Sequence, residues 1–298
     1  MLVSGDGTSA TAPSEPKPRS GRPPLSLALG FRTDSEARAL VRAAQLYADG
    51  RLGTARPIFD RYQSFEARVG AAFARWPDGA LERLEQLANL YPESAVVQLH
   101  LGLARLWADR GDPATAWRDA VDAEPDTPYA ILASNLLHPN LPRGLPTFIP
   151  SFPAPQAVIE LSAARQLEAL RRRAERGSAR ESILYGVGLQ RVGRPISAAR
   201  AFERAAKLAP SDVEALVADA VGRFDKDAPA RAFGRLGPLT RTFPNEPTVR
   251  FHLGVMLLWT GQVQAAERQL RIASRTKPGS PLAQEAKRYL ETIRHARS

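Results

Sequence analysis

The sequence predicts an all-α fold, a right-handed α-solenoid of about seven helix pairs closed by a C-terminal capping helix. From about Thr33 onward, apolar residues recur every three or four positions, and a glycine or proline interrupts them every 12 to 18 residues. This pattern is typical of consecutive short helices. Pro210, Pro244 and Pro278 are spaced by 34 residues, which indicates that a unit of two helices repeats. No stretch shows a convincing strand-like alternation.

Small residues stand at two fixed positions in each repeating unit, 24 and 12 residues before its proline. A small side chain in a helix lets a neighbouring helix approach closely, and a large apolar residue four positions after the second column fills the adjoining layer. Proline ends the second helix because it cannot continue the hydrogen-bond ladder. The first column is Gly186, Ala220 and Gly254, the second is Ala198, Ala232 and Ala266, and the large residues are Phe202, Leu236 and Leu270.

This period resembles the tetratricopeptide repeat (TPR), a helix–turn–helix of 34 residues. Ser182 stands where that family has its leading tryptophan. Helices this short are marginal alone, so stacking of neighbouring units must supply the core. The best-matching unit contains Tyr185, Gly186, Leu189, Gly193, Ala198, Phe202, Ala205 and Pro210.

An earlier part of the chain repeats the same landmarks out of phase. The run from Leu99 to Gly102, with Trp107, mirrors the run from Phe251 to Gly254, with Trp259. The offset of 152 residues equals four periods of 34 plus 16. A proline-rich stretch, His138 to Pro155, is the candidate for the extra residues.

The expected organisation therefore has four parts. Residues 1–32 form a disordered tail rich in proline and serine, 33–137 the N-terminal TPR-like repeats, 138–155 a proline-rich insert, and 156–298 the C-terminal TPR-like repeats and capping helix. Within the first array, an apolar stripe predicts one long helix over 54–76, or two fused with no turn, and a further helix over 80–91. Residues 281–295 are expected to form the capping helix.

Composition and motifs argue against catalysis. The chain of 298 residues has no cysteine and four histidines, none with a ligand partner four residues on, and no nucleotide-binding or nucleophile motif. We therefore expect no enzyme activity, cofactor, metal or small-molecule substrate. No apolar run approaches the roughly 20 residues of a membrane span. Residues 25–31 are too short for a secretory signal, so we expect a cytoplasmic protein without membrane contact.

The TPR resemblance implies that the second, fifth, ninth and twelfth positions of each first helix line a concave groove. In this sequence those positions are mostly apolar, and the lysine and asparagine pattern that clamps a carboxylate in chaperone-binding members is missing. The chain is thus expected to be a non-enzymatic scaffold that binds a protein or peptide partner in this groove. The candidate partner-binding residues are Leu99, Leu103, Ile183, Val187, Val217, Val221, Phe251 and Val255.

Three arrangements could cover such an apolar surface, since leaving it in water forfeits roughly 1.5–3 kcal/mol for each side chain. A partner could occupy it, residues 141–152 could fold back into it, or tight curvature could make it ordinary core. A different function, nucleic-acid binding, is the alternative. Residues 127–298 carry 26 basic and 14 acidic side chains, a net charge of +12, but few aromatic residues for base stacking.

Overall fold

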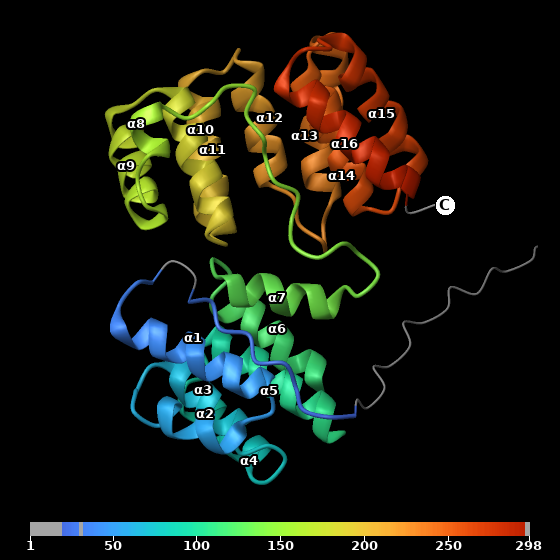
Figure 1. Ribbon diagram of the computed structural model, residues 1–298. Helices are drawn as coiled ribbons and strands as arrows, with labels where there is room; N and C mark the ends of the chain where they lie inside the picture. Colours follow the sequence, from blue (N-terminus) through green and yellow to red (C-terminus); the bar gives the residue numbers. More distant parts are fainter. Residues whose placement is uncertain (1–19, 30–31, 296–298) are drawn as a thin grey trace, which may run out of the picture.

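The computed structural model describes residues 20–29 and 32–295, which contain sixteen helices and no strand (Figure 1). The all-α prediction is confirmed. The helices of the first half are α1 (Ser35–Ala48), α2 (Leu52–Phe59), α3 (Phe65–Phe73), α4 (Ala80–Leu90), α5 (Ala95–Ala108), α6 (Pro113–Ala123) and α7 (Pro128–Leu137). Those of the second half are α8 (Gln156–Ile159), α9 (Ala163–Arg176), α10 (Ala179–Arg191), α11 (Pro195–Leu208), α12 (Val213–Gly222), α13 (Ala230–Thr242), α14 (Pro247–Trp259), α15 (Val263–Thr276) and α16 (Pro281–His295).

Consecutive helices pack as the pairs of a solenoid. The contacting pairs are α1–α2, α3–α4, α5–α6, α10–α11, α12–α13 and α14–α15, and α16 caps the last of them by packing on α15 and α14. The predicted small-residue column makes these contacts close. A Cβ atom added at Gly186 would lie 2.3 Å from Cε1 of Phe202, and one at Gly102 would lie 2.3 Å from Nε1 of Trp117. Side chains larger than hydrogen therefore do not fit there.

Both helices of the seventh pair are present, but they do not pack on each other. By the 34-residue period, α7 and α9 are the two helices of one unit, yet α7 packs on α5 and α6 while α9 packs on α10. Residues 138–155, which contain no helix, lie between them in the chain. The described residues therefore form an N-terminal stack (α1–α7) and a C-terminal stack (α9–α16), which lie one above the other in Figure 1.

Loops join the two stacks. The carboxylate of Asp126, before α7, accepts hydrogen bonds from the backbone N–H groups of Ile196 and Ser197 at 2.9 and 3.0 Å. It thereby caps the start of α11, which has no side-chain cap of its own. Nζ of Lys226, between α12 and α13, donates to Oδ1 of Asn135 on α7 at 2.6 Å and to the carbonyl of Pro142 at 3.0 Å.

The prediction of an unbroken helix over residues 54–76 was wrong. Helix α2 ends at Phe59 and α3 begins at Phe65, where the Ser64 hydroxyl accepts a hydrogen bond from the N–H of Ala67. The turn lets the two helices pack side by side, since a Cβ atom at Gly70 would lie 2.4 Å from Cε1 of Phe59. The apolar stripe that suggested one helix is the buried face of two.

The expectation of disorder over residues 1–32 does not hold for residues 20–29. This N-terminal segment lies extended along the N-terminal stack (Figure 1), and Leu29 is buried. The hydroxyl of Tyr47 donates to the carbonyl of Pro23 at 2.6 Å. Five hydrogen bonds hold the segment: four join its backbone to side chains of the stack, and one is donated by its own Arg22 to the carbonyl of Ala48. Proline content alone did not indicate them. Residues 1–19 lie outside the described part of the chain.

Candidate functional site

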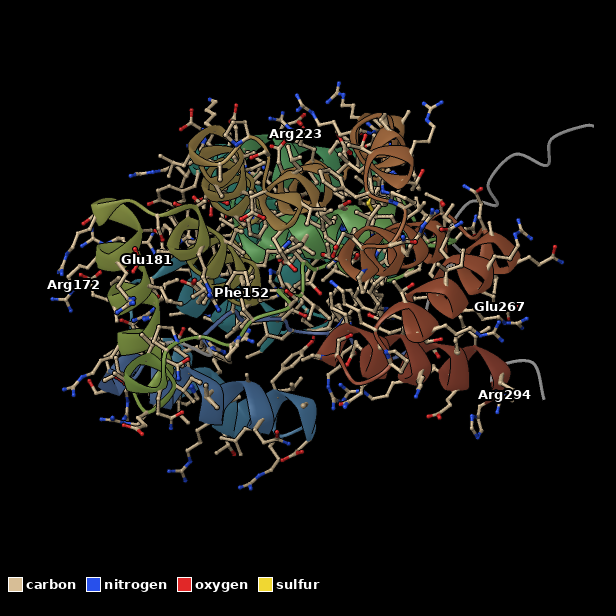
Figure 2. All side chains as sticks on the ribbon, turned by 90° about the horizontal axis from the view of Figure 1, so that it is seen from above. Phe152, Arg172, Glu181, Arg223, Glu267 and Arg294 are labelled. Carbon is tan, nitrogen blue, oxygen red and sulfur yellow. The ribbon has the colours of Figure 1, made fainter. Side chains whose placement is uncertain are left out.

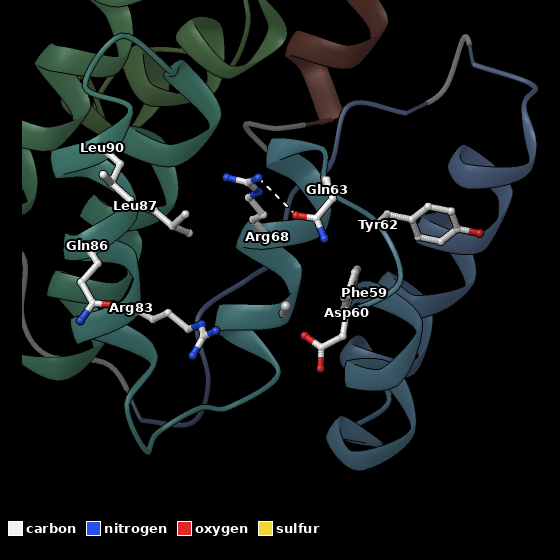
Figure 3. Close-up of a pocket in the computed structure, with 10 residues that line it drawn as sticks. Phe59, Asp60, Tyr62, Gln63, Arg68, Arg83, Gln86, Leu87 and Leu90 are labelled. Atoms are coloured by element: carbon white, nitrogen blue, oxygen red, sulfur yellow. Dashed lines mark hydrogen bonds between the residues drawn. The ribbon is translucent and has the colours of Figure 1, made fainter.

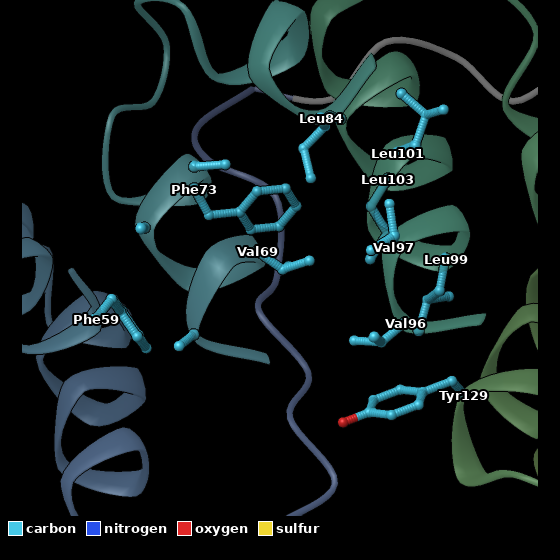
Figure 4. Close-up of a cluster of buried hydrophobic side chains, with 14 of the residues drawn as sticks. Phe59, Val69, Phe73, Leu84, Val96, Val97, Leu99, Leu101, Leu103 and Tyr129 are labelled. Atoms are coloured by element: carbon cyan, nitrogen blue, oxygen red, sulfur yellow. The ribbon is translucent and has the colours of Figure 1, made fainter. Parts of the chain in front are cut away.

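The eight candidate groove residues are buried, and none is more than 9% exposed. Two extended segments of the same chain contribute side chains to the clusters that contain them. Leu99 and Leu103 share a cluster with Leu29 of the N-terminal segment, and Figure 4 shows the helical side of that cluster. Ile183, Val187, Val217 and Val221 share a cluster with Phe148, whereas Phe251 and Val255 lie in a neighbouring cluster against which Ile149 packs.

Residues 145–152 occupy the C-terminal site, which we define as Gln190, Glu214, His252 and the six candidate residues from Ile183 to Val255. Phe148 is the anchor of this segment and is 1% exposed. Its ring stacks on the His252 ring, with centroids 4.6 Å apart at 14°, and meets the Phe202 ring edge-on at 5.7 Å. In the C-terminal stack, residues 145–152 therefore fold back onto the apolar surface, whereas Leu99 and Leu103 lie in a cluster that contains no residue of this segment.

Polar side chains of the C-terminal site bond the backbone of this segment. Oε1 of Gln190 accepts from the N–H of Phe148 at 3.0 Å, and Nε2 of His252 accepts from the N–H of Ile149 at 2.9 Å. Oε2 of Glu214 accepts from the N–H of Ser151 at 3.4 Å. Burial raises the pKa of Glu214. These three hydrogen bonds are all made to backbone N–H groups of the segment.

His252 is held as a neutral acceptor. Its Nδ1 atom lies 2.7 Å from the carbonyl of Thr248, one turn earlier on α14, so Nδ1 carries the proton and Nε2 is left to accept. The residue is fully buried, and burial lowers the pKa of His252 to about 4. A charged imidazolium could not accept the N–H of Ile149.

The N-terminal site, defined as Tyr47, Leu99, His100, Leu103 and Tyr129, uses the same device. Nδ1 of His100 lies 2.6 Å from the carbonyl of Val96, and its Nε2 accepts from the N–H of Ser26 at 3.2 Å. Burial lowers the pKa of His100 to about 4. The hydroxyl of Tyr129 accepts from the N–H of Ala28 at 3.0 Å and donates to Glu66. The two histidines occupy equivalent repeat positions, so one interaction occurs twice.

Two open hollows of about 340 Å³ each lie outside these sites. The first lies between the end of α2 and helices α3 and α4, with Arg68 and Arg83 at its sides (Figure 3). Arg68 already donates to Gln63 at 3.2 Å and to the Tyr91 hydroxyl at 2.7 Å. The second lies between α9, α10 and α11 above Ser182, the residue at the position of the missing tryptophan.

Many arginines of the C-terminal stack are paired with its own carboxylates. Arg171 bridges Glu168 and Glu175, while Arg223 and Arg235 both reach Asp219. Charged side chains project outward around the molecule (Figure 2).

The described residues contain neither a cluster of metal ligands nor a membrane-spanning helix. No group of three or more histidine, aspartate or glutamate side chains within residues 20–29 and 32–295 is placed to hold a metal ion. No helix in that part of the chain is long and apolar enough to cross a membrane. The cytoplasmic location stays a prediction of the sequence.

The period, the paired helices and the close small-residue contacts define an all-α solenoid of TPR-like repeats. No family model and no curated protein sequence matches the chain. Similar solved structures include the APC/C hetero-tetramer Cut9–Hcn1, at 14% identity and a TM-score of 0.33, covering 87% of this chain and 55% of that one. Yeast Tom70 is similar at 13% identity and a TM-score of 0.34, with 93% and 68% covered. The chain thus spans about half the length of the Cut9–Hcn1 chain that it matches.

Sequence reasoning found the apolar lining of the site but missed its polar part. Gln190, Glu214 and His252 were not among the candidate partner-binding residues. The available signal was a histidine, His100 or His252, at the same place in two repeating units.

Proposed function

We propose that the protein is a non-enzymatic interaction scaffold that binds an extended polypeptide at the C-terminal site, in place of residues 145–152. The observation that carries the proposal is that this site already holds an extended chain through three hydrogen bonds to its backbone. Contacts of that kind give affinity for any extended peptide, and the surrounding pockets add specificity. An anchor pocket between His252 and Phe202 supplies the apolar part.

The internal segment competes with any partner. It is tethered at both ends, so its effective concentration at the site is on the order of mM. A free peptide must bind strongly enough to displace the segment at that effective concentration, or the segment must first be loosened. Weakening the internal anchor should therefore reveal the binding capacity of the site.

The experiment uses the full-length chain with Phe148→Ala and a fluorescein-labelled peptide of residues 143–154. We expect saturable binding by fluorescence anisotropy, at least tenfold tighter than to the unaltered protein, because the internal competitor has lost its anchor. Leu25→Ala is the matched control, since it weakens the N-terminal segment and leaves the C-terminal site closed. No saturable binding to a Phe148→Ala protein with the unaltered circular dichroism spectrum would refute the proposal.

A further inference from the structure

Two segments of this chain lie in the same register against equivalent histidines. Ser26 and Ile149 are the residues whose N–H groups meet Nε2 of His100 and His252. Counted from these, a proline stands three positions before in each case, at Pro23 and Pro146, and both prolines are buried. A large apolar residue stands one position before, Leu25 in one segment and Phe148 in the other.

The match continues on both sides of the histidine contact. The residue between the proline and the anchor is exposed in both segments, as is the residue two positions after the contact. That later residue donates a second hydrogen bond in each case, from Ala28 to the Tyr129 hydroxyl and from Ser151 to Glu214. Alternate N–H groups of an extended chain point to the same side, so two acceptors on the stack can bond both.

The two segments run in opposite directions relative to the order of the helices, and the position of the second acceptor shows this. In the N-terminal stack it is on α7, one unit after the histidine on α5, and that segment runs with the order of the helices. In the C-terminal stack it is on α12, one unit before the histidine on α14, and residues 149–152 run the opposite way. The shared register is therefore set by the bound segment and by the spacing of the two acceptors. It does not depend on the direction in which the segment runs along the stack.

Each position of the register has a physical reason. A buried proline leaves no unpaired N–H, and its ring favours the extended backbone. The anchor of the C-terminal site is aromatic because it fills the space between two rings, His252 and Phe202. The next residue must not be proline, because its N–H is the donor to His252.

We propose that the partner of the C-terminal site is an extended peptide with the pattern proline, any residue, aromatic residue, non-proline residue, and that residues 145–152 are the internal copy of this ligand. The inference rests on the proposed function and specifies its ligand. The N–H after the aromatic residue bonds His252, and the N–H two positions later bonds Glu214.

The first test varies the peptide against the full-length Phe148→Ala protein. The probe is the peptide of residues 143–154, with single changes at the positions of Pro146, Phe148 and Ile149. We expect Phe148→Ala in the peptide to weaken binding at least a hundredfold and N-methylation of the Ile149 amide to weaken it about tenfold or more, because Nε2 of His252 loses its donor. N-methylation at Thr147, which is exposed and whose N–H donates no hydrogen bond within the described residues, is the control and should leave affinity within about twofold.

The second test varies the protein. Ile149→Pro removes the N–H that reaches His252, whereas Thr147→Pro places proline at the exposed position where the N-terminal segment already has Pro24. We expect the unaltered peptide to bind the Ile149→Pro protein at least tenfold tighter than the Thr147→Pro or unaltered protein. Circular dichroism spectra equal to that of the unaltered protein establish that both variants are folded.

The outcomes separate the two proposals. If all the peptides bind the opened protein with equal affinity, the pattern is wrong and the interaction function stands. If no peptide binds a folded Phe148→Ala or Ile149→Pro protein, the proposed function is wrong and so is the pattern. If the Thr147→Pro protein binds as tightly as the Ile149→Pro protein, the histidine contact does not set the register.

Discussion

Acidification should destabilise the protein through its two buried histidines. Burial lowers the pKa of His100 and His252 to about 4, from an ordinary 6.5. As the pH falls below 6.5, the unfolded chain binds protons that the folded protein excludes, so the free energy of unfolding decreases until the pH reaches about 4. Above 6.5 the stabilisation is fully present. A difference of this size corresponds to about 3 kcal/mol for each histidine.

The assay is urea unfolding at several pH values between 7.5 and 4.5, for the unaltered protein and a His100→Gln/His252→Gln variant. Glutamine can accept the N–H of Ser26 or Ile149 but does not titrate. Carboxylates also take up protons as the pH falls, and burial raises the pKa of Glu214. They do so in both proteins, so the difference between the two curves isolates the histidines. Equal slopes between pH 6.5 and 5 would refute the reasoning.

Four substitutions test the packing and the joint between the stacks. Asp126→Ala removes the cap of α11 and should lower the free energy of unfolding by about 1 kcal/mol, measured by urea unfolding. Gly186→Ala forces a methyl group against Phe202 and should cost about 1–3 kcal/mol, whereas Gly234→Ala, with open space around its Cβ, should stabilise α13 by about 0.5–1 kcal/mol. Equal effects at the two glycines would contradict the packing argument. Lys226→Met leaves the carbonyl of Pro142 without its donor and should speed cleavage of residues 138–155 by thermolysin about tenfold; an unchanged rate would mean that this bond does not hold the insert.

The repeating framework could be predicted because its signals are local and periodic. Gly186 and Gly254 mark close helix contacts, and Gly193 and Gly261 have φ of 70° and 73° at the turns where the 34-residue register places them. Each of these requirements acts within one unit and recurs in the next. The separation of α7 from α9 follows from the same arithmetic, since the extra residues fall between them.

The occupants of the two sites could not be predicted in the same way. The bond between Ile149 and His252 joins residues 103 positions apart, and it uses a backbone N–H that every non-proline residue possesses. No side-chain pattern distinguishes that donor from its neighbours. Proline content indicated disorder for residues 20–29, yet a buried proline in an extended segment suits a site that bonds the backbone on either side of it. Composition alone does not separate these two roles.

The insert couples the C-terminal site to the joint between the stacks. Its first residues hold the joint, through His138, whose Nε2 lies 2.8 Å from Asp227, and through Pro142, whose carbonyl accepts from Lys226. Its later residues fill the C-terminal site, with Phe148 as the anchor. Because Phe148 lies only six positions after Pro142, we expect a peptide that displaces Phe148 to strain the hydrogen bond at Pro142 as well. Linkage is reciprocal, so whatever loosens the joint lowers the effective concentration of the internal ligand and raises the apparent affinity for a partner. A continuous solenoid would lack this connection. If the proposed function holds, we expect the split pair α7–α9 to link occupancy of the C-terminal site to the arrangement of the two stacks.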